Sequence, residues 1–192
     1  MISPPGVFLR PKEKIPLPQV AFCLGQGDPL EARLLQQGLL KHTAPGLWEV
    51  LTREAQAQGE VARDGDFIKL DSIGMPYPVE AAFFLPRHTR QPDGRYLQTP
   101  RVLQAWRQEE PMGHEMLYLL ETGLLQHHPE TPEAAFRAFL YGTWQTVAAD
   151  AVIIFDSIET SPRGTIEEIE FHFIARDEFE KTYRILPENT PV

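Results

Sequence analysis

The feature of this sequence that most constrains its fold is an internal repeat. Segments 34–42 and 119–127 read LLQQGLLKH and LLETGLLQH, so both fit the pattern LLxxGLLxH at an offset of 85 residues. A second match, FIKLDSI at 67–73 against VIIFDSI at 152–158, falls on the same offset. Two separate matches at the same offset indicate two diverged copies of a single unit.

The two copies have recognisable limits. Copy one spans residues 8–89 and copy two residues 96–186, while segments 1–7 and 187–192 are tails. The connector 90–95 contains Gln-Pro-Asp-Gly, a sequence typical of a turn. Each copy is close to the size at which a lone core is marginal, so we expect the two copies to pack as one globule.

Local signals predict the same order of elements in each copy. Asp28-Pro29-Leu30-Glu31 has the form of an N-cap, a proline at the first helical position and a capping-box glutamate. Further helix is expected at 47–51, and the repeat-related His42 and His127 are interpreted as charged groups at helix C-termini. The other expectations are strands at 20–24, 66–70, 144–154 and 168–174, an inserted hairpin turn at 160–164 and a closing helical turn at 177–183.

These elements predict an α+β fold with an internal duplication. Each small half is expected to combine a helix with an antiparallel hairpin. The two halves are expected to pack about a pseudo-twofold axis, because related copies with a shared surface tend to associate symmetrically.

Composition and charge exclude several classes of protein. Hydrophobic residues make up 42% and charged residues 23%, which is typical of a globular chain. No apolar run approaches the roughly 20 residues of a membrane span. The formal net charge of −9 argues against a nucleic-acid partner, since phosphate binding needs a positive surface. The first residues lack a secretion signal and Cys23 has no second cysteine to pair with, which together predict a cytoplasmic protein.

Several short motifs resemble a known family. Tyr96–Pro100, followed by Ala105-Trp106, is similar to the opening of a small phage and prophage domain named for its PGDYG motif, and Asp177–Tyr183 is similar to its ending. Copy one keeps the naming motif as Arg63–Ile68 and the Tyr-Pro piece at Tyr77–Val79. Copy two departs from the pattern. It has Ala-Asp-Ala-Val at 149–152 where the family has Gly-Asp and an aromatic residue, and Phe-Ile at 173–174 where the family has Tyr-Pro. The resemblance implies two tandem domains and a mobile-element origin, but no activity.

Three acidic residues are the first candidates for a functional site. Asp71 and Asp156 occupy equivalent positions, so a pseudo-twofold axis would bring them together as a metal-binding or acid–base pair. The alternative is that each aspartate simply begins a hairpin turn. Asp66 lies nearby in the sequence. The polar side chains of Tyr77, Arg87 and His88 near the end of copy one would line a shared cleft.

The leading hypothesis is a non-catalytic binding or interaction protein. Its ligand would be a protein or a small molecule bound at the junction of the copies, through the six residues named above. The alternative is a small hydrolase or nucleotide-processing enzyme that uses Asp66, Asp71 and His88 as acid–base or metal groups. A third reading is an acidic surface for a basic partner. The sequence identifies no cofactor and predicts no dedicated metal site.

Overall fold

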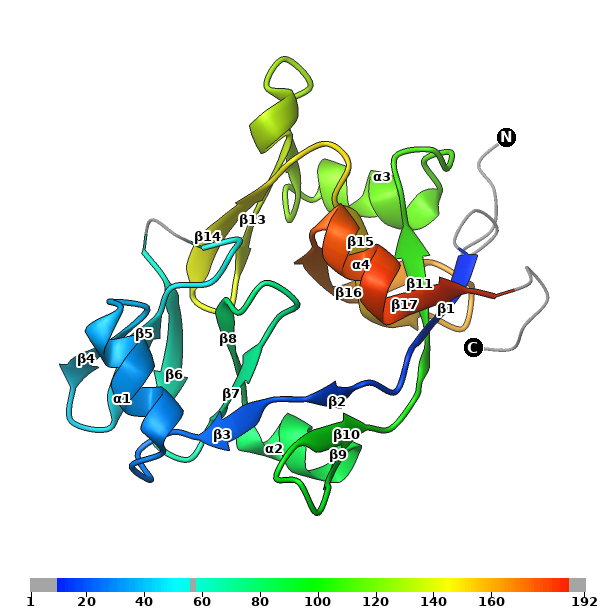
Figure 1. Ribbon diagram of the computed structural model, residues 1–192. Helices are drawn as coiled ribbons and strands as arrows, with labels where there is room; N and C mark the ends of the chain where they lie inside the picture. The colour runs from blue at the N-terminus through cyan, green and yellow to red at the C-terminus, as the bar shows by residue number, and fades with distance from the viewer. Residues whose placement is uncertain (1–9, 56–57, 187–192) are drawn as a thin grey trace. The chain divides into compact units, whose positions relative to one another are not determined.

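The computed structural model describes residues 10–55 and 58–186, and side chains from Lys14 onward within those ranges. It combines α-helices with small antiparallel sheets, so the predicted α+β class is confirmed (Figure 1). The described chain divides into two compact units. Unit 1 contains residues up to Ile15 together with 100–139 and 145–186, and unit 2 contains 16–99 and the hairpin tip 140–144. None of the described helices is both long and apolar enough to cross a membrane.

Unit 2 holds three three-stranded sheets, in the orders β3-β7-β8, β4-β5-β6 and β2-β10-β9. Its elements are β2 (Pro18–Gln19), β3 (Ala21–Cys23), α1 (Pro29–Gln36), β4 (Leu40–Ala44), β5 (Leu47–Val50), β6 (Glu60–Arg63), β7 (Phe67–Leu70), β8 (Pro76–Val79), α2 (Ala81–Phe84), the 3-10 turn η1 (Leu85–Arg87), β9 (His88–Arg90) and β10 (Tyr96–Gln98).

Unit 1 holds a five-stranded sheet, in the order β16-β15-β11-β1-β17, and most of the sheet β12-β13-β14. Its elements are β1 (Arg10–Lys14), β11 (Val102–Trp106), α3 (His114–Glu121), β12 (Gln126–His127), the 3-10 turn η2 (Pro132–Ala134), β13 (Phe136–Leu140), β14 (Thr143–Val147), β15 (Val152–Thr160), β16 (Ile166–Ile174), α4 (Arg176–Thr182) and β17 (Tyr183–Ile185).

The central strands pair with matching register in the two units. In unit 2, β7 lies between β3 and β8; in unit 1, β15 lies between β11 and β16. Strand β15 and its partner β16 are longer, and they continue into the hairpin turn predicted at 160–164. The residues that lie opposite one another are Phe22, Ile68 and Pro78 in unit 2, and Trp106, Ile153 and Phe173 in unit 1.

The strands that begin each half of the sequence are exchanged. Strand β1 joins the C-terminal half by pairing with β11 and β17, while β10 pairs with β2 and β9 (Figure 1). Each of these strands is followed by a proline, Pro16 or Pro100, before the next strand begins. Proline favours an extended conformation in the residue before it, Ile15 or Thr99, which disfavours a helix at either connection.

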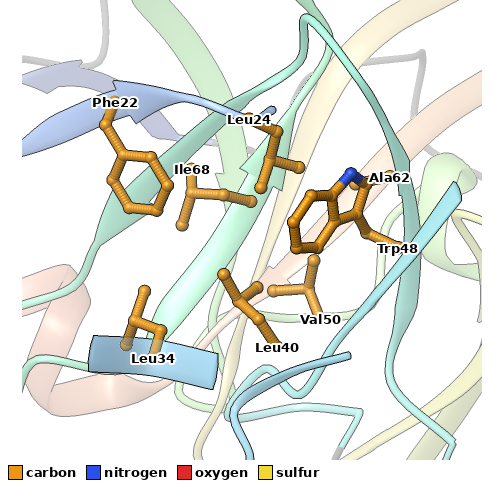
Figure 2. Close-up of a cluster of buried hydrophobic side chains, with 8 residues drawn as sticks. All are labelled: Phe22, Leu24, Leu34, Leu40, Trp48, Val50, Ala62 and Ile68. Atoms are coloured by element: carbon orange, nitrogen blue, oxygen red, sulfur yellow. The ribbon is translucent and has the colours of Figure 1, made fainter. Parts of the chain in front are cut away.

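The core of unit 2 is built where α1 covers the sheets, as Figure 2 shows. Helix α1 contributes Leu34, which is 1% exposed, and alternate residues of β5 turn Trp48 and Val50 inward. The Trp48 indole N–H donates to the Asp64 carboxylate at 2.7 Å, which satisfies its polar atom. The cluster consists of Phe22, Leu24, Leu34, Leu40, Trp48, Val50, Ala62 and Ile68.

The core of unit 1 lies between α4 and one face of the five-stranded sheet. Phe179 of α4 stacks on Tyr183 of β17, with the ring centroids 5.2 Å apart. In unit 2, Phe84 of α2 stacks in the same way on His88 of β9, at 4.0 Å. The buried members of the unit 1 cluster are Leu103, Ala105, Val152, Ile154, Phe179 and Tyr183.

Two predictions around the repeated LLxxGLLxH motif are wrong. Helix α1 ends at Gln36 because Gly38 takes a left-handed conformation, with φ of 71°, and the chain then enters β4. His42 therefore lies on a strand and contacts Trp48, at a centroid distance of 3.6 Å, instead of capping a helix. His127 likewise lies on a strand, β12, and its ring stacks on that of Phe136 with the centroids 4.7 Å apart. The motif encodes a helix, a glycine stop and a strand.

Two further predictions are wrong for related reasons. Segment 47–51 is strand β5 instead of a helix, because β5 is paired on both sides by β4 and β6. Segment 144–154 contains two strands, β14 and β15, separated by a turn.

Other local predictions are confirmed. Asp28 caps α1 by accepting from the Leu30 N–H at 2.8 Å. The capping-box role predicted for Glu31 is wrong, because Glu31 accepts from the Gly25 N–H at 2.8 Å and so anchors the preceding loop. The turns at 91–94 and 160–164 and the helix α4 also lie where they are expected.

Candidate functional site

Asp71 serves as a turn residue. Its Oδ1 atom accepts from the backbone N–H groups of Ile73 at 2.9 Å and Met75 at 2.8 Å. These bonds close the turn between β7 and β8, which is the structural alternative considered for this residue.

Asp66 lies at the opposite end of β7. It accepts from the backbone N–H of Arg63 at 2.9 Å and of Ala81 at 3.3 Å. At about 3.3 Å per residue, the strand separates Asp66 from Asp71 by roughly 16 Å, so the two carboxylates do not act on one atom. Asp66 borders an open hollow of about 350 Å³ together with Val61, Arg63 and Glu80.

A buried lysine brings Tyr77 and His88 together. Lys69 is only 2% exposed, and its Nζ lies 3.1 Å from His88 Nε2 and 5.5 Å from the centre of the Tyr77 ring. Nζ also donates to Gln98 Oε1 at 3.3 Å. His88 Nδ1 lies 2.9 Å from the carbonyl oxygen of Phe84, which can only accept, so Nδ1 carries the proton and Nε2 accepts from Lys69.

Arg87 is not part of this network. Its guanidinium lies 5.0 Å from the centre of the Phe83 ring and donates to the Phe83 carbonyl at 3.3 Å, on the exposed side of η1.

Asp156 forms a second polar cluster, which lies entirely within unit 1. Its Oδ2 is 2.5 Å from His172 Nδ1, and its Oδ1 is 3.7 Å from Arg101 Nη2. Arg101 Nη2 also donates to the Asp156 carbonyl at 3.2 Å. Asp156 is the extra residue of a β-bulge, because Phe155 and Ser157 lie opposite consecutive residues of β16. The bulge redirects the Asp156 side chain toward His172 on the neighbouring strand.

The two clusters differ in whether a buried amine lies at their centre. The side chains of Arg101, Asp156 and His172 are 33%, 27% and 23% exposed, so each group of the unit 1 cluster can meet a ligand from solution. In unit 2, Tyr77 and His88 are also partly exposed, but the Lys69 between them is buried.

Lys14 of β1 borders the unit 1 cluster. Its Nζ lies 5.3 Å from the centre of the Tyr183 ring. Burial lowers the pKa of Lys14 to about 8, against the opposing effect of the carboxylates of Glu178 and Asp156. Burial also raises the pKa of Tyr183, so that its phenol keeps its proton at physiological pH.

The remaining predictions concern pairs and metals. Asp71 belongs to unit 2 and Asp156 to unit 1, so their direct pairing stays a prediction. Within the residues that the structure describes, no three His, Cys, Asp or Glu side chains are grouped closely enough to hold a metal ion.

Sequence reasoning missed five residues of these clusters: Lys14, Lys69, Gln98, Arg101 and His172. The repeat offered one signal for His172. Tyr77 and His172 occupy corresponding positions of the β7–β8 and β15–β16 hairpins, opposite Lys69 and Ile154. The search for related proteins adds nothing to these assignments, since no family model, curated protein or solved structure matches the chain.

Proposed function

We propose that the chain arose by internal duplication and that the first strand of each copy pairs with strands of the other copy. Helix α1 begins at residue 29 and α3 at residue 114, which preserves the offset of 85. After the inserted hairpin turn, α2 begins at residue 81 and α4 at residue 176, an offset of 95. The central strands keep matching registers as far as the bulge at Asp156, which supports a common ancestor for the copies. The predicted pseudo-twofold packing and the PGDYG-like, mobile-element origin belong to the same proposal.

We further propose that the protein is a non-catalytic binding protein whose ligand site is the cluster of Asp156, His172 and Arg101. The observation that supports this assignment is a histidine held by a carboxylate and open to solvent. The Asp156 carboxylate fixes the ring of His172 through Nδ1, so that Nε2 is presented in a defined direction. A ring held in this way can meet a ligand with little loss of side-chain entropy.

One observation favours an enzyme as the second candidate. An imidazole oriented by a carboxylate is also the arrangement of a general base, in which Nε2 takes up the proton. The alternative hydrolase or nucleotide-processing function would then use Asp156 and His172, in place of the Asp66, Asp71 and His88 set that the sequence suggested. The carboxylates of Asp66 and Asp71 already accept hydrogen bonds from backbone N–H groups, which favours Asp156 and His172 as the catalytic pair.

The test is native mass spectrometry of the protein purified gently from its own host. We expect a ligand bound to the wild type and to the control variant His128→Ala, whose histidine is exposed in a loop of the same unit. The variant His172→Ala should lose the ligand. Retention of the ligand by His172→Ala would place the binding site elsewhere. Chemical conversion of the captured ligand during incubation would favour the enzyme.

A further inference from the structure

The unit 1 cluster carries more hydrogen-bond donors than its own acceptors use. Arg101 donates through Nη2, and its Nε and Nη1 groups have no acceptor among the described residues. His172 engages only Nδ1, so Nε2 is likewise not engaged by any described residue. Lys14 Nζ meets the face of Tyr183 without donating to a described oxygen. Arg101 and His172 therefore flank the Asp156 carboxylate, Arg101 has donors to spare, and Lys14 lies near enough for the charge of Asp156 to act on it.

The charges near these donors are close to balanced. Lys14 and Arg101 are the cations, and Asp156 and Glu178 are the carboxylates whose charges act on Lys14. An incoming anion could accept hydrogen bonds from the guanidinium of Arg101, beside the ring of His172.

The corresponding positions of unit 2 are already satisfied internally. Gln98 of β10 lies opposite His88 of β9, just as Lys14 of β1 lies opposite Tyr183 of β17 in unit 1. In unit 2, however, the lysine comes from β7, and Lys69 donates to both His88 and Gln98. The amine of Lys69 thus donates to acceptors within unit 2. In unit 1, by contrast, Arg101 has donors available to a ligand.

We propose that this cluster binds an oxyanion, a carboxylate or phosphate group held between Arg101, His172 and Lys14. The proposal rests on the binding function proposed above and names the chemical class of its ligand. The planar guanidinium of Arg101 suits two oxygens of one such group, which a neutral ligand would not exploit as fully. Lys14 reaches the site only because β1 pairs with β11 and β17, so the exchanged strand completes the site.

The experiment is a titration of the full chain followed by the NMR signals of the His172 imidazole. The probes are inorganic phosphate, acetate and, as an uncharged control, glycerol. We expect saturable shifts with phosphate, with acetate or with both, and none with glycerol. Saturation by phosphate alone assigns a phosphate group, and saturation by acetate alone assigns a carboxylate.

Variants test the individual donors. Arg101→Met and Lys14→Met should each weaken binding by about tenfold or more, as expected for the loss of a hydrogen bond from a charged group. The control variants Arg90→Met and Lys41→Met remove exposed cations of unit 2 and should bind like the wild type. Circular dichroism spectra of all variants separate loss of binding from loss of fold.

Two results would overturn the oxyanion assignment, and they differ in what they say about the proposed function. If neither anion shifts the wild-type signals, but a neutral ligand from the host is lost in His172→Ala, the site stands and its ligand class is wrong. If neither anion binds and no ligand depends on His172, both proposals fail. Neither result depends on the folding of the Arg101 or Lys14 variants.

Discussion

Replacing Glu60 by glutamine should make unit 2 more stable at alkaline pH. Glu60 lies on β6 with 6% of its surface exposed, and its Oε1 accepts from the Thr52 hydroxyl at 2.9 Å. Burial raises the pKa of this carboxyl from 4.5 to about 7, and the charge of Glu54 adds to the effect, although the Thr52 hydrogen bond opposes it. The folded protein therefore favours the protonated, neutral carboxyl.

The size and sign of the effect follow from that pKa. A rise of about 2.5 units at 1.36 kcal/mol each corresponds to about 3 kcal/mol. Because the folded pKa is the higher one, the stabilisation is complete below pH 4.5 and is lost as the pH rises through about 7. Glutamine resembles the protonated carboxyl in shape and charge. The variant should therefore match the wild type near pH 4.5 and exceed its stability by about 3 kcal/mol at pH 8.

The assay is urea unfolding of both proteins at intervals between pH 4.5 and pH 8, followed by circular dichroism. Glu168→Gln, an exposed carboxyl on β16, is the matched control and should shift the free energy of unfolding by less than about 0.5 kcal/mol at every pH. A constant difference between Glu60→Gln and the wild type across this range would refute the reasoning. So would a variant that is less stable than the wild type at pH 8.

Three other substitutions test the packing of unit 2. Leu34→Ala should lower the free energy of unfolding in urea by about 2–5 kcal/mol, because it opens a cavity in the core, and a change below about 1 kcal/mol would contradict the packing described. Lys69→Met should lower the free energy of unfolding by about 1–3 kcal/mol, because it removes the donor that His88 Nε2 and Gln98 Oε1 share, and an unchanged or higher stability would contradict a stabilising role for these contacts. Gly25→Ala should lower the thermal midpoint in calorimetry, because φ is +76° and the added Cβ would lie 2.8 Å from Asp64 Oδ1, and an unchanged midpoint would contradict that geometry.

The parts of the fold that the sequence could predict are those fixed by neighbouring residues. Asp28 and Pro29 define the start of α1 through contacts within one turn, and the turn of Asp71 closes over four residues. The strand at 47–50 was missed because a short apolar run is compatible with a helix or a strand, and its state is decided by pairing with β4 and β6.

The candidate site could be predicted only in part for the same reason. Asp156 was found through the repeat, but its partners Arg101 and His172 are brought to it by strand pairing and by the bulge in β15. A lysine in a strand ordinarily indicates a solvent-facing position, so nothing local marked Lys69 as buried against His88.

The exchange of β1 also sets an order for biosynthesis. Strand β1 is translated before both of its neighbours, β11 and β17, and β17 ends only at Ile185. Most of unit 2 ends at Thr99, so its sheets can form while the rest of the chain is still being translated. Throughout that time β1 has an open edge and must wait for the longest-range contact of the fold. A chaperone that shields β1 during translation would therefore protect an unpaired strand edge until β17 pairs with it.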